Sequence, residues 1–287
     1  MELFDSRFIS NLKQIHLLMK KKFHGKTIGN RMTRRHGGSA EFADYKEYQP
    51  GDDLRFIDWN LFARLEKLYV KLFHNEEALD IYIFLDTSDS LAFDEKKAFY
   101  SKQLVGALAF IALQFQDRVK IIPTEQGMER STSMLSGAPS AKTVFSFLSH
   151  IPGSTDSNFE QCVLQFTKHT RRVSLVFVIS DFFFNYQETL KRLNFYKHQV
   201  HLIQVLTPEE MHPDFLGHYK FQDVETKEGL DLFLEPPLLE QYYEEMDNFL
   251  KELESYCRQN KMLYHRVATD FPLTSLLLKM FDIGKLE

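Results

Sequence analysis

Three short segments carry oxygen-bearing side chains at places where a strand is expected to end. The first, D-T-S-D-S at residues 86–90, directly follows the apolar run 79–86. The second, P-G-S-T-D at 152–156, precedes an expected helix, and the third, Ser180 with Asp181, closes the apolar run 172–181. In open α/β sheets, binding sites form at the carboxyl ends of the strands. We therefore expect these segments to contribute to one site.

The spacing within the first segment indicates which side chains can share a ligand. Asp86, Ser88 and Ser90 alternate, so their side chains can turn toward one point as the strand opens into a loop. With Thr155 and Asp181 they form a set of oxygen donors suited to a hard cation such as Mg²⁺. Burying Asp86 and Asp181 near each other would be costly without a cation, which is the physical reason to expect a metal.

A structural interpretation competes with the metal site. Asp86 can cap the next turn, and the two serines can bond to the local backbone. The D-x-S-x-S spacing alone favours neither interpretation. The order and context of Thr155 and Asp181 favour the metal. A metal that keeps a water position free would let a carboxylate from a partner complete its coordination shell.

Alternating apolar and amphipathic segments predict the elements that position these residues. From residue 79 onward, expected strands alternate with expected helices, which implies a parallel sheet covered on both faces and doubly wound. We predict a mostly parallel, Rossmann-type α/β domain over 79–287 with an inserted β-hairpin near 219–235. Residues 1–78 are predicted to form an N-terminal helix and an extension packed on that domain. The expected strands are 79–86, 118–124, 172–181, 200–206 and 262–269, and the main expected helices are 94–116, 140–151, 158–169, 186–199 and 237–259.

The three ligand segments resemble the metal-ion-dependent adhesion site of von Willebrand factor A (vWA) domains. The resemblance lies in D-x-S-x-S after the first core strand, G-x-T at 153–155 before a helix, and S-D after a later strand. It implies a first ligand loop with Asp86, Ser88 and Ser90, a second with Thr155 and a third with Asp181, around Mg²⁺ or another divalent cation. Many vWA domains have glycine after the third-loop aspartate, where this chain has Phe182, so the shape of the third loop is open.

The segment 38–64, GSAEFADYKEYQPGDDLRFIDWNLFAR, narrows the resemblance further. Its pattern Y-x-P-G-D-D-x-R-x-I-D-W followed by A-R, together with E-T-K-E-G near Glu225, is similar to the bacterial family DUF58, a vWA-like group. Members of that family are typically encoded beside MoxR-type AAA+ ATPases, and the pair is thought to assist the maturation or assembly of protein complexes. The resemblance implies a non-catalytic adaptor that grips the ATPase or a client protein through its metal site.

The residues of this segment also allow a structural prediction that does not depend on the family. Opposite charges between residues 52 and 64 suggest fixed ion pairs, and Trp59 with Phe56 and Ile57 suggests a packed segment against the sheet. A binding face is the alternative interpretation. The charged side chains concerned are Asp52, Asp53, Arg55, Asp58 and Arg64.

A metal-dependent phosphohydrolase and a nucleotide-binding domain are the two alternative functions. A metal-dependent phosphohydrolase would use Asp86 as nucleophile. Dehalogenase-like enzymes of that kind carry D-x-D, whereas Ser88 stands at the third position here, so the acid is missing. A nucleotide site is not favoured, because neither G-x-G-x-x-G nor a P-loop motif occurs.

Composition limits the compartment and the partners. The net charge of -5 is mild, but residues 1–36 hold nine Lys or Arg against two acids, which allows peripheral membrane contact through this basic N-terminus. Aromatic residues are not interleaved there at stacking spacing, so we expect no nucleic acid. Cys162 and Cys257 lack metal or redox spacing, and no run of about 18 apolar residues predicts a membrane span. The sequence also lacks a signal peptide's apolar stretch, so the expected location is the cytoplasm.

Overall fold

The computed structural model describes residues 3–24, 41–74, 78–92, 94–124, 127–151, 158–170, 172–214, 216–222 and 229–283. By their contacts the residues form two units, a larger one comprising Met1–Lys22 with Leu79–Glu287 and a smaller one comprising Phe23–Ala78. Contacts therefore place most of helix α1 (Ser6–His24) with the larger unit. The predicted division of the chain into domains after residue 78 stays a prediction.

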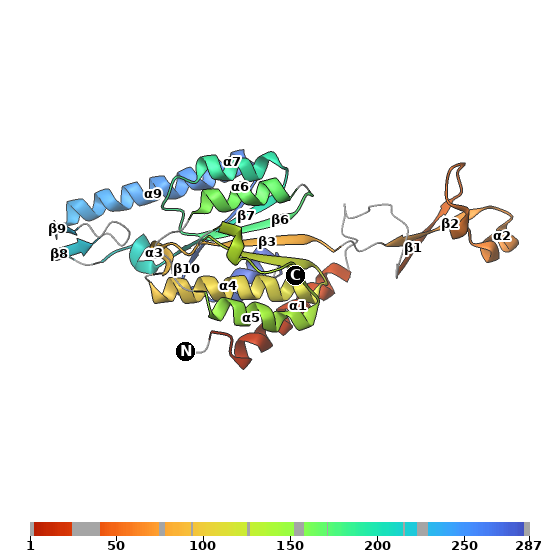
Figure 1. The fold of residues 1–287 in the computed structure, drawn as a ribbon, viewed down its shortest axis with the longest axis horizontal. Coiled ribbons are helices and arrows are strands. Elements are labelled where there is room, and N and C mark those ends of the chain that lie inside the picture. Colours follow the sequence, from red (N-terminus) through yellow and green to blue (C-terminus); the bar gives the residue numbers. More distant parts are fainter. Residues whose placement is uncertain are drawn as a thin grey trace. The chain divides into compact units, whose positions relative to one another are not determined.

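A six-stranded sheet forms the centre of the larger unit, as far as the structure describes it (Figure 1). The strand order is β10-β7-β6-β3-β4-β5, so the chain extends the sheet in both directions from β3. Five strands are parallel, and the short β5 (Leu135–Ser136) pairs antiparallel with β4. The mostly parallel, doubly wound sheet predicted from the sequence is confirmed. The parallel strands are β3 (Asp80–Leu85), β4 (Arg118–Pro123), β6 (Leu175–Ser180), β7 (Gln199–Leu206) and β10 (Leu263–Ala268).

Helices cover both faces of this sheet (Figure 1). One face carries α4 (Glu95–Gln114) and α5 (Ala141–Ser149), and α1 packs there through Phe8 against Phe145. The other face carries α6 (Phe159–His169), α7 (Gln187–Phe195) and α9 (Pro236–Gln259). The last helix, α10 (Leu273–Met280), follows β10. Every main helix expected from the periodicity is present.

The core explains why the strands are so apolar. Every residue of β3 is buried, as expected for a strand covered on both faces. On the side of α6, α7 and α9, Phe84 packs edge-to-face with Phe166, and Leu190 and Leu253 belong to the same buried cluster. Each such side chain contributes about 1.5–3 kcal/mol through burial. Helix α4 is buried over most of its surface, because it lies between the sheet and the layer formed by α1 and α5.

Side-chain caps fix where two of the helices begin. The Asp94 carboxylate caps α4, because it accepts hydrogen bonds from the backbone N–H groups of Lys96 (2.7 Å) and Lys97 (3.1 Å). The Asn158 side chain accepts from Gln161 N at 2.9 Å and begins α6. These caps set which side chains of the first turns face the sheet edge.

A short helix and a hairpin follow β7. Helix α8 (Pro208–Met211) begins with a capping box, in which Thr207 and Glu210 bond to each other's backbone N–H groups. Strands β8 (Gly217–Gln222) and β9 (Gly229–Leu234) then pair antiparallel, as predicted. The first arm begins earlier than expected, and the K-E-G turn lies outside the described residues. Over the described residues, we find no helix with the length and apolar character needed to cross a membrane.

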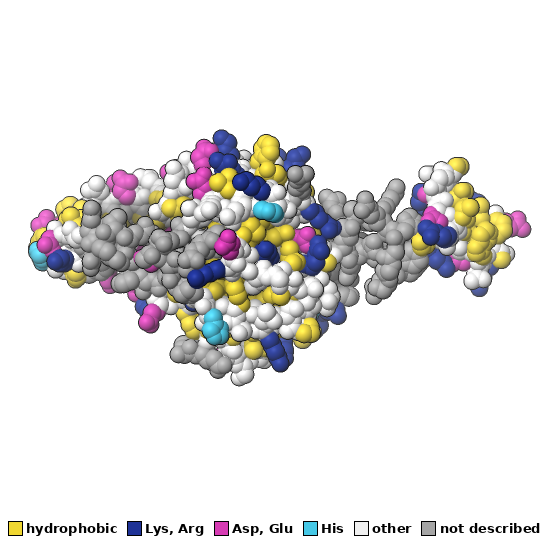
Figure 2. Space-filling view, in the orientation of Figure 1, with side chains coloured by type: hydrophobic (Ala, Val, Ile, Leu, Met, Phe, Trp, Pro, Cys, Tyr) yellow, Lys and Arg dark blue, Asp and Glu magenta, His cyan; other side chains and the backbone are white. Residues whose placement is uncertain are grey.

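The smaller unit contains β1 (Glu41–Glu47) and β2 (Tyr69–His74), paired antiparallel, and α2 (Trp59–Leu65). Ile57 is buried in this unit, whereas Trp59 is 63% exposed. Packing of this segment against the central sheet stays a prediction. Trp59 is the first residue of α2 and contacts Phe62, also exposed. Figure 2 shows hydrophobic side chains gathered on the visible face of this unit.

The charged residues of this unit pair mostly with its two strands. Asp58 accepts from Tyr45 of β1 (2.8 Å) and pairs with Lys71 of β2 (3.0 Å), and these bonds lower the pKa of Asp58 to about 2. Asp52 pairs with Lys46 of β1 at 3.0 Å. Within the segment itself, Arg55 pairs with Asp53 at 2.7 Å. One predicted ion pair therefore forms within residues 52–64, whereas Asp52 and Asp58 pair with lysines outside that stretch.

Candidate functional site

The first and third predicted loops meet at the carboxyl edge of the sheet. Strands β3 and β6 are neighbours in register, with Leu85 beside Ile179, and Asp86 N donates to Ile179 O at 2.9 Å. Asp86 follows β3 and Asp181 follows β6, so parallel pairing brings both aspartates to the same edge. This edge lies where the chain changes direction along the sheet, the expected place for a ligand site.

Asp86 is buried and held by its neighbours. Its side chain is 4% exposed. Oδ2 accepts from Ser180 Oγ at 2.6 Å, while Oδ1 accepts from Ser88 N at 2.9 Å and Thr124 Oγ1 at 3.3 Å. Burial raises the pKa of Asp86, and the charge of Asp181 raises it further, although the bonds from Ser180 and Ser88 oppose this shift. A positive charge nearby would stabilise the ionised carboxylate.

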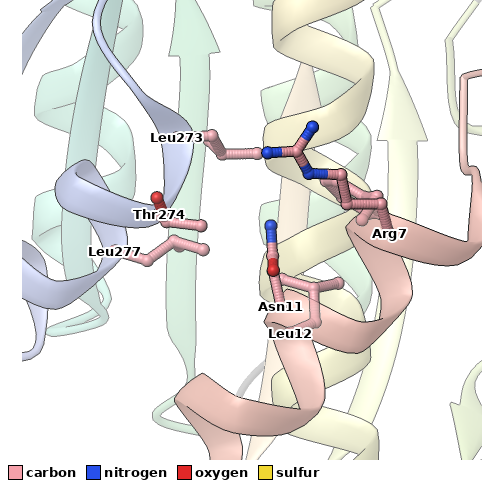
Figure 3. Close-up of a pocket in the computed structure, with 7 residues that line it drawn as sticks. Arg7, Asn11, Leu12, Leu273, Thr274 and Leu277 are labelled. Atoms are coloured by element: carbon pink, nitrogen blue, oxygen red, sulfur yellow. The ribbon is translucent and has the colours of Figure 1, made fainter.

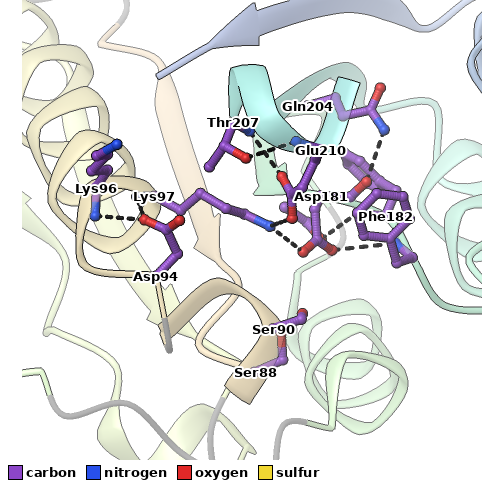
Figure 4. Close-up of polar contacts among 12 residues, drawn as sticks. Ser88, Ser90, Asp94, Lys96, Lys97, Asp181, Phe182, Gln204, Thr207 and Glu210 are labelled. Atoms are coloured by element: carbon purple, nitrogen blue, oxygen red, sulfur yellow. Dashed lines mark hydrogen bonds and ion pairs between the residues drawn. The ribbon is translucent and has the colours of Figure 1, made fainter. Parts of the chain in front are cut away.

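The two predicted serine ligands lie together. The hydroxyls of Ser88 and Ser90 are 3.0 Å apart, both residues are half-buried, and Figure 4 shows them side by side below Asp181. Ser90 belongs to the short helix α3 (Asp89–Ala92), whose turn brings its hydroxyl back toward Ser88. The bond from Ser88 N to Asp86 is also the local bond that the structural interpretation expects. The geometry of this loop is therefore compatible with both interpretations.

Asp181 is bound to a lysine that the sequence analysis did not single out. Its Oδ2 accepts from Lys97 Nζ at 2.8 Å, and its Oδ1 accepts from Phe183 N at 3.2 Å. Lys97 also donates to Glu210 Oε1 at 2.8 Å (Figure 4). Asp181 is 1% exposed and Lys97 is fully buried. Thr155, the predicted second-loop ligand, lies outside the described residues.

Lys97 remains charged in this environment. Burial by itself lowers the pKa of the ammonium, but the carboxylates of Asp181 and Glu210 outweigh this effect and raise the pKa of Lys97 above its ordinary value. A sequence signal for this residue exists, because Lys97 stands at helical spacing from Ser101, Leu104 and Leu108 on the buried side of α4. A lysine at such a position must find a buried partner.

The third loop keeps a glycine-type backbone although it carries phenylalanine. Phe182 has φ 62°, the left-handed region that favours glycine. Its fully buried side chain packs edge-to-face against Tyr186. Gln204 Nε2 donates to the carbonyl of Asp181 at 2.8 Å, which fixes the preceding residue. Phe182 therefore adopts a backbone conformation that glycine takes more readily.

The donor set at the edge fits a divalent cation. Asp86, Ser88 and Ser90 offer a carboxylate and two converging hydroxyls, the hard oxygen donors that Mg²⁺ and similar ions prefer. Lys97 Nζ contacts two carboxylates, those of Asp181 and Glu210, and Asp86 is a further buried carboxylate at the same edge of the sheet. Among the described residues, no three His, Cys, Asp or Glu side chains cluster in a way that could hold a metal ion. The fit thus depends on the hydroxyls.

A separate cavity of about 230 Å³ lies between α1 and α10 (Figure 3). Arg7 and Asn11 supply polar atoms, and Leu12, Leu273 and Leu277 supply apolar surface. None of its lining residues belongs to the strand-end loops, so it is not part of the candidate site.

Comparison with known proteins places the chain in a family. The family described as "Protein of unknown function DUF58" matches residues 44–247, well over half of the chain. The chain belongs to this family. Its match includes β3, β6 and β7, and therefore all the described residues of the candidate site.

Curated relatives of this DUF58 protein have no described function. The uncharacterized proteins Mb1516 of Mycobacterium bovis and Rv1480 of Mycobacterium tuberculosis are each 22% identical over 253 residues, covering 83% of this chain and 77% of the relative.

Two solved structures show limited likeness. The conserved hypothetical protein BatB from Bacteroides thetaiotaomicron is 18% identical with a TM-score of 0.41, over 72% of this chain and all of that chain. An aerotolerance-related membrane protein from Bacteroides fragilis is 17% identical with a TM-score of 0.45, over 73% of this chain and all of that one. At these scores the likeness carries no functional argument.

Proposed function

We propose that this DUF58 protein is a non-catalytic protein-interaction module whose strand-edge site binds Mg²⁺ or another divalent cation, as a metal-ion-dependent adhesion site does. The observation that carries the proposal is the convergence of Asp86, Ser88 and Ser90 at the carboxyl edge of the sheet, beside a second buried carboxylate, Asp181. Thr155 is proposed as a further ligand.

In this proposal the protein supplies part of the coordination shell and a partner completes it. Asp86 would provide the charged ligand, and the hydroxyls of Ser88 and Ser90 would provide neutral ones. Mg²⁺ usually keeps several waters. A carboxylate from a partner would replace one of them. The bonds from Ser180 and Thr124 hold Asp86 in place, so the ligand needs little reorganisation on binding.

The proposed partner is a MoxR-type AAA+ ATPase, its client protein, or both. The partnership is supported by membership of the DUF58 family, because the resemblance to that family implies it. The argument is therefore one of analogy. The hydrolytic alternative lacks its acid, because Ser88 stands where D-x-D phosphohydrolases carry the second aspartate.

The N-terminal helix supports a further peripheral contact. Helix α1 buries Leu12, Ile15 and Met19, but Leu17 and Leu18 are exposed on a segment rich in lysine. A basic helix with exposed apolar residues suits an anionic membrane surface. For the compartment we propose the cytoplasm, since both cysteines, Cys162 and Cys257, are buried without a disulfide.

Metal-dependent binding of the partner is tested by substituting each of two aspartates of the same loop. Asp86→Ala is expected to abolish Mg²⁺-dependent recovery of the ATPase in a pull-down, because it removes the only carboxylate of the first ligand loop at the buried edge. Asp89→Ala, a half-buried acid of the same loop outside the alternating set, is the matched control and should behave as wild type. Equal recovery with wild type and Asp86→Ala, with and without chelator, would overturn the proposal.

A further inference from the structure

Lys97 is the one feature of the site that a simple cation-binding loop does not explain. Its ammonium lies 2.8 Å from both Asp181 Oδ2 and Glu210 Oε1 and 5.7 Å from the centroid of the Phe183 ring. It is fully buried, at the end of a side chain that starts in the first turn of α4. Burying a lysine is costly, and here two carboxylates and an aromatic face stabilise it.

The position of Lys97 has a direct consequence for any second cation. Asp86 Oδ2 accepts from Ser180 Oγ at 2.6 Å, and the next residue, Asp181, holds the ammonium at 2.8 Å, so Lys97 lies near the proposed ligands. Two like charges in a poorly solvated site repel each other strongly. While Lys97 holds Asp181, a metal bound to that carboxylate would lie beside the ammonium, whose Nζ is 2.8 Å from Oδ2.

We propose that Lys97 is an internal counter-cation that competes with the divalent ion, so that it sets the metal affinity of the site and leaves Asp86, Ser88 and Ser90 as the ligands. Glu210 has the opposite role: it offers Lys97 a second partner and adds negative charge, which favours the divalent ion. This inference rests on the proposed metal site and names the residue that regulates its occupancy.

The test is a titration of the full chain with Mg²⁺ by calorimetry, repeated with Mn²⁺ by electron paramagnetic resonance. Lys97→Met removes the competing charge and leaves two carboxylates to be neutralised, so the cation should bind at least about tenfold more tightly than in wild type. Glu210→Gln removes a negative charge and leaves Lys97 bound to Asp181 alone, so binding should weaken.

The matched control is the neighbouring lysine. Lys96 pairs with Glu209 at 3.4 Å, both side chains are mostly exposed, and Figure 4 shows Lys96 directed away from Lys97. Lys96→Met removes the same charge from the same helical turn, but at a solvent-screened position. Its affinity for Mg²⁺ should stay within about twofold of wild type.

The outcomes separate this inference from the proposed function. Tighter binding in Lys97→Met supports the inference. If wild type binds no Mg²⁺ at tens of millimolar while Lys97→Met does, the inference stands and the metal-dependent function of the wild-type chain fails. If wild type binds and Lys97→Met binds equally or more weakly, the inference is overturned and the metal site stands. No binding in either overturns both.

A folding defect in Lys97→Met also has a defined reading. If the variant unfolds in chelator and refolds with Mg²⁺, the cation has replaced the ammonium, which supports the inference. If the variant does not fold in either condition, the Mg²⁺ affinity of Glu210→Gln tests the proposal instead. The proposal would be overturned if Glu210→Gln bound Mg²⁺ as tightly as wild type or more tightly.

Discussion

Phe182 is subject to two opposing effects in the third loop, backbone strain and favourable side-chain packing. The backbone after Asp181 turns through the left-handed region, which costs a non-glycine residue roughly 1–2 kcal/mol. The fully buried ring offsets that cost through its packing against Phe184 and Tyr186. A glycine would satisfy the backbone without supplying the packing, and the phenylalanine does the reverse.

This balance predicts an unusual order of stability. Phe182→Ala should lower the free energy of unfolding by about 3–5 kcal/mol, because it leaves a cavity. Phe182→Gly loses the same ring but relieves the left-handed strain, so it should be less destabilised than Phe182→Ala by about 1 kcal/mol. Urea denaturation of both variants measures the difference. At a position without left-handed strain, a glycine variant is less stable than an alanine variant. A Phe182→Gly variant less stable than Phe182→Ala would therefore contradict the argument.

The residues of the site were predictable to different degrees. Asp86, Ser88 and Asp181 follow apolar runs, and the strand-end rule for parallel sheets places them on one edge. Lys97 was not found, because its partners lie 84 and 113 residues further along the chain. Helical spacing could show that it faces inward, but not which carboxylates it meets. Trp59, expected to pack with Phe56 and Ile57 against the sheet, is exposed within its own unit.

Among the elements, the first turn of α4 is the one that the site depends on most. Asp94 caps this turn, and Lys97 is its third helical residue. Loss of the cap would leave backbone N–H groups without their partner and loosen the turn that carries the lysine. The proposed metal site and the stability of α4 are therefore linked through one carboxylate.

Asp94→Ala should lower the free energy of unfolding by about 1 kcal/mol, measured by urea denaturation. Asp94→Ser keeps a side-chain oxygen at the cap and should stay within a few tenths of wild type. A loss of equal size in both variants would show that charge, rather than the capping bond, is what matters.

Elements with long periodic patterns were predicted with nearly correct bounds, and short ones were not. The five parallel strands and the main helices lie within a few residues of their expected ranges, because burial on both faces leaves a continuous apolar run. Helix α8 has four residues, too few to show a period, although its Thr207–Glu210 capping box was visible in the sequence. The strands of the smaller unit were also missed, because half-buried strands rich in charge resemble a polar segment.

For the whole molecule, buried and half-buried histidines make the protein less stable in acid. Burial lowers the pKa of His198, His201 and His265, and for His201 burial and the neighbouring His265 lower it to about 4. The unfolded chain has histidine pKa values near 6.5. Between these values the unfolded state binds more protons than the native state, so stability falls as the pH drops from about 6.5 toward 4.

His201→Phe should weaken this dependence. The ring keeps its contact partner Phe177, but the variant has one fewer group that takes up a proton on unfolding. The slope of unfolding free energy against pH should decrease by up to about 1.4 kcal/mol per pH unit between pH ~6.5 and ~5. Urea denaturation across this range measures it, with the exposed His150→Gln as control. Identical slopes in His201→Phe and wild type would contradict the assignment.

The connectivity of the two units has a practical corollary. Residues 23–78 interrupt the larger unit, because α1 on one side of them and β3 on the other both belong to it. By their contacts they stand as an insertion in the larger unit. Trimming the chain from its first residue through residue 78 would strip Leu12, Ile15 and Met19 from the interior of the remaining protein. An internal excision of the insertion would spare them, which makes it the sound way to ask what the smaller unit contributes.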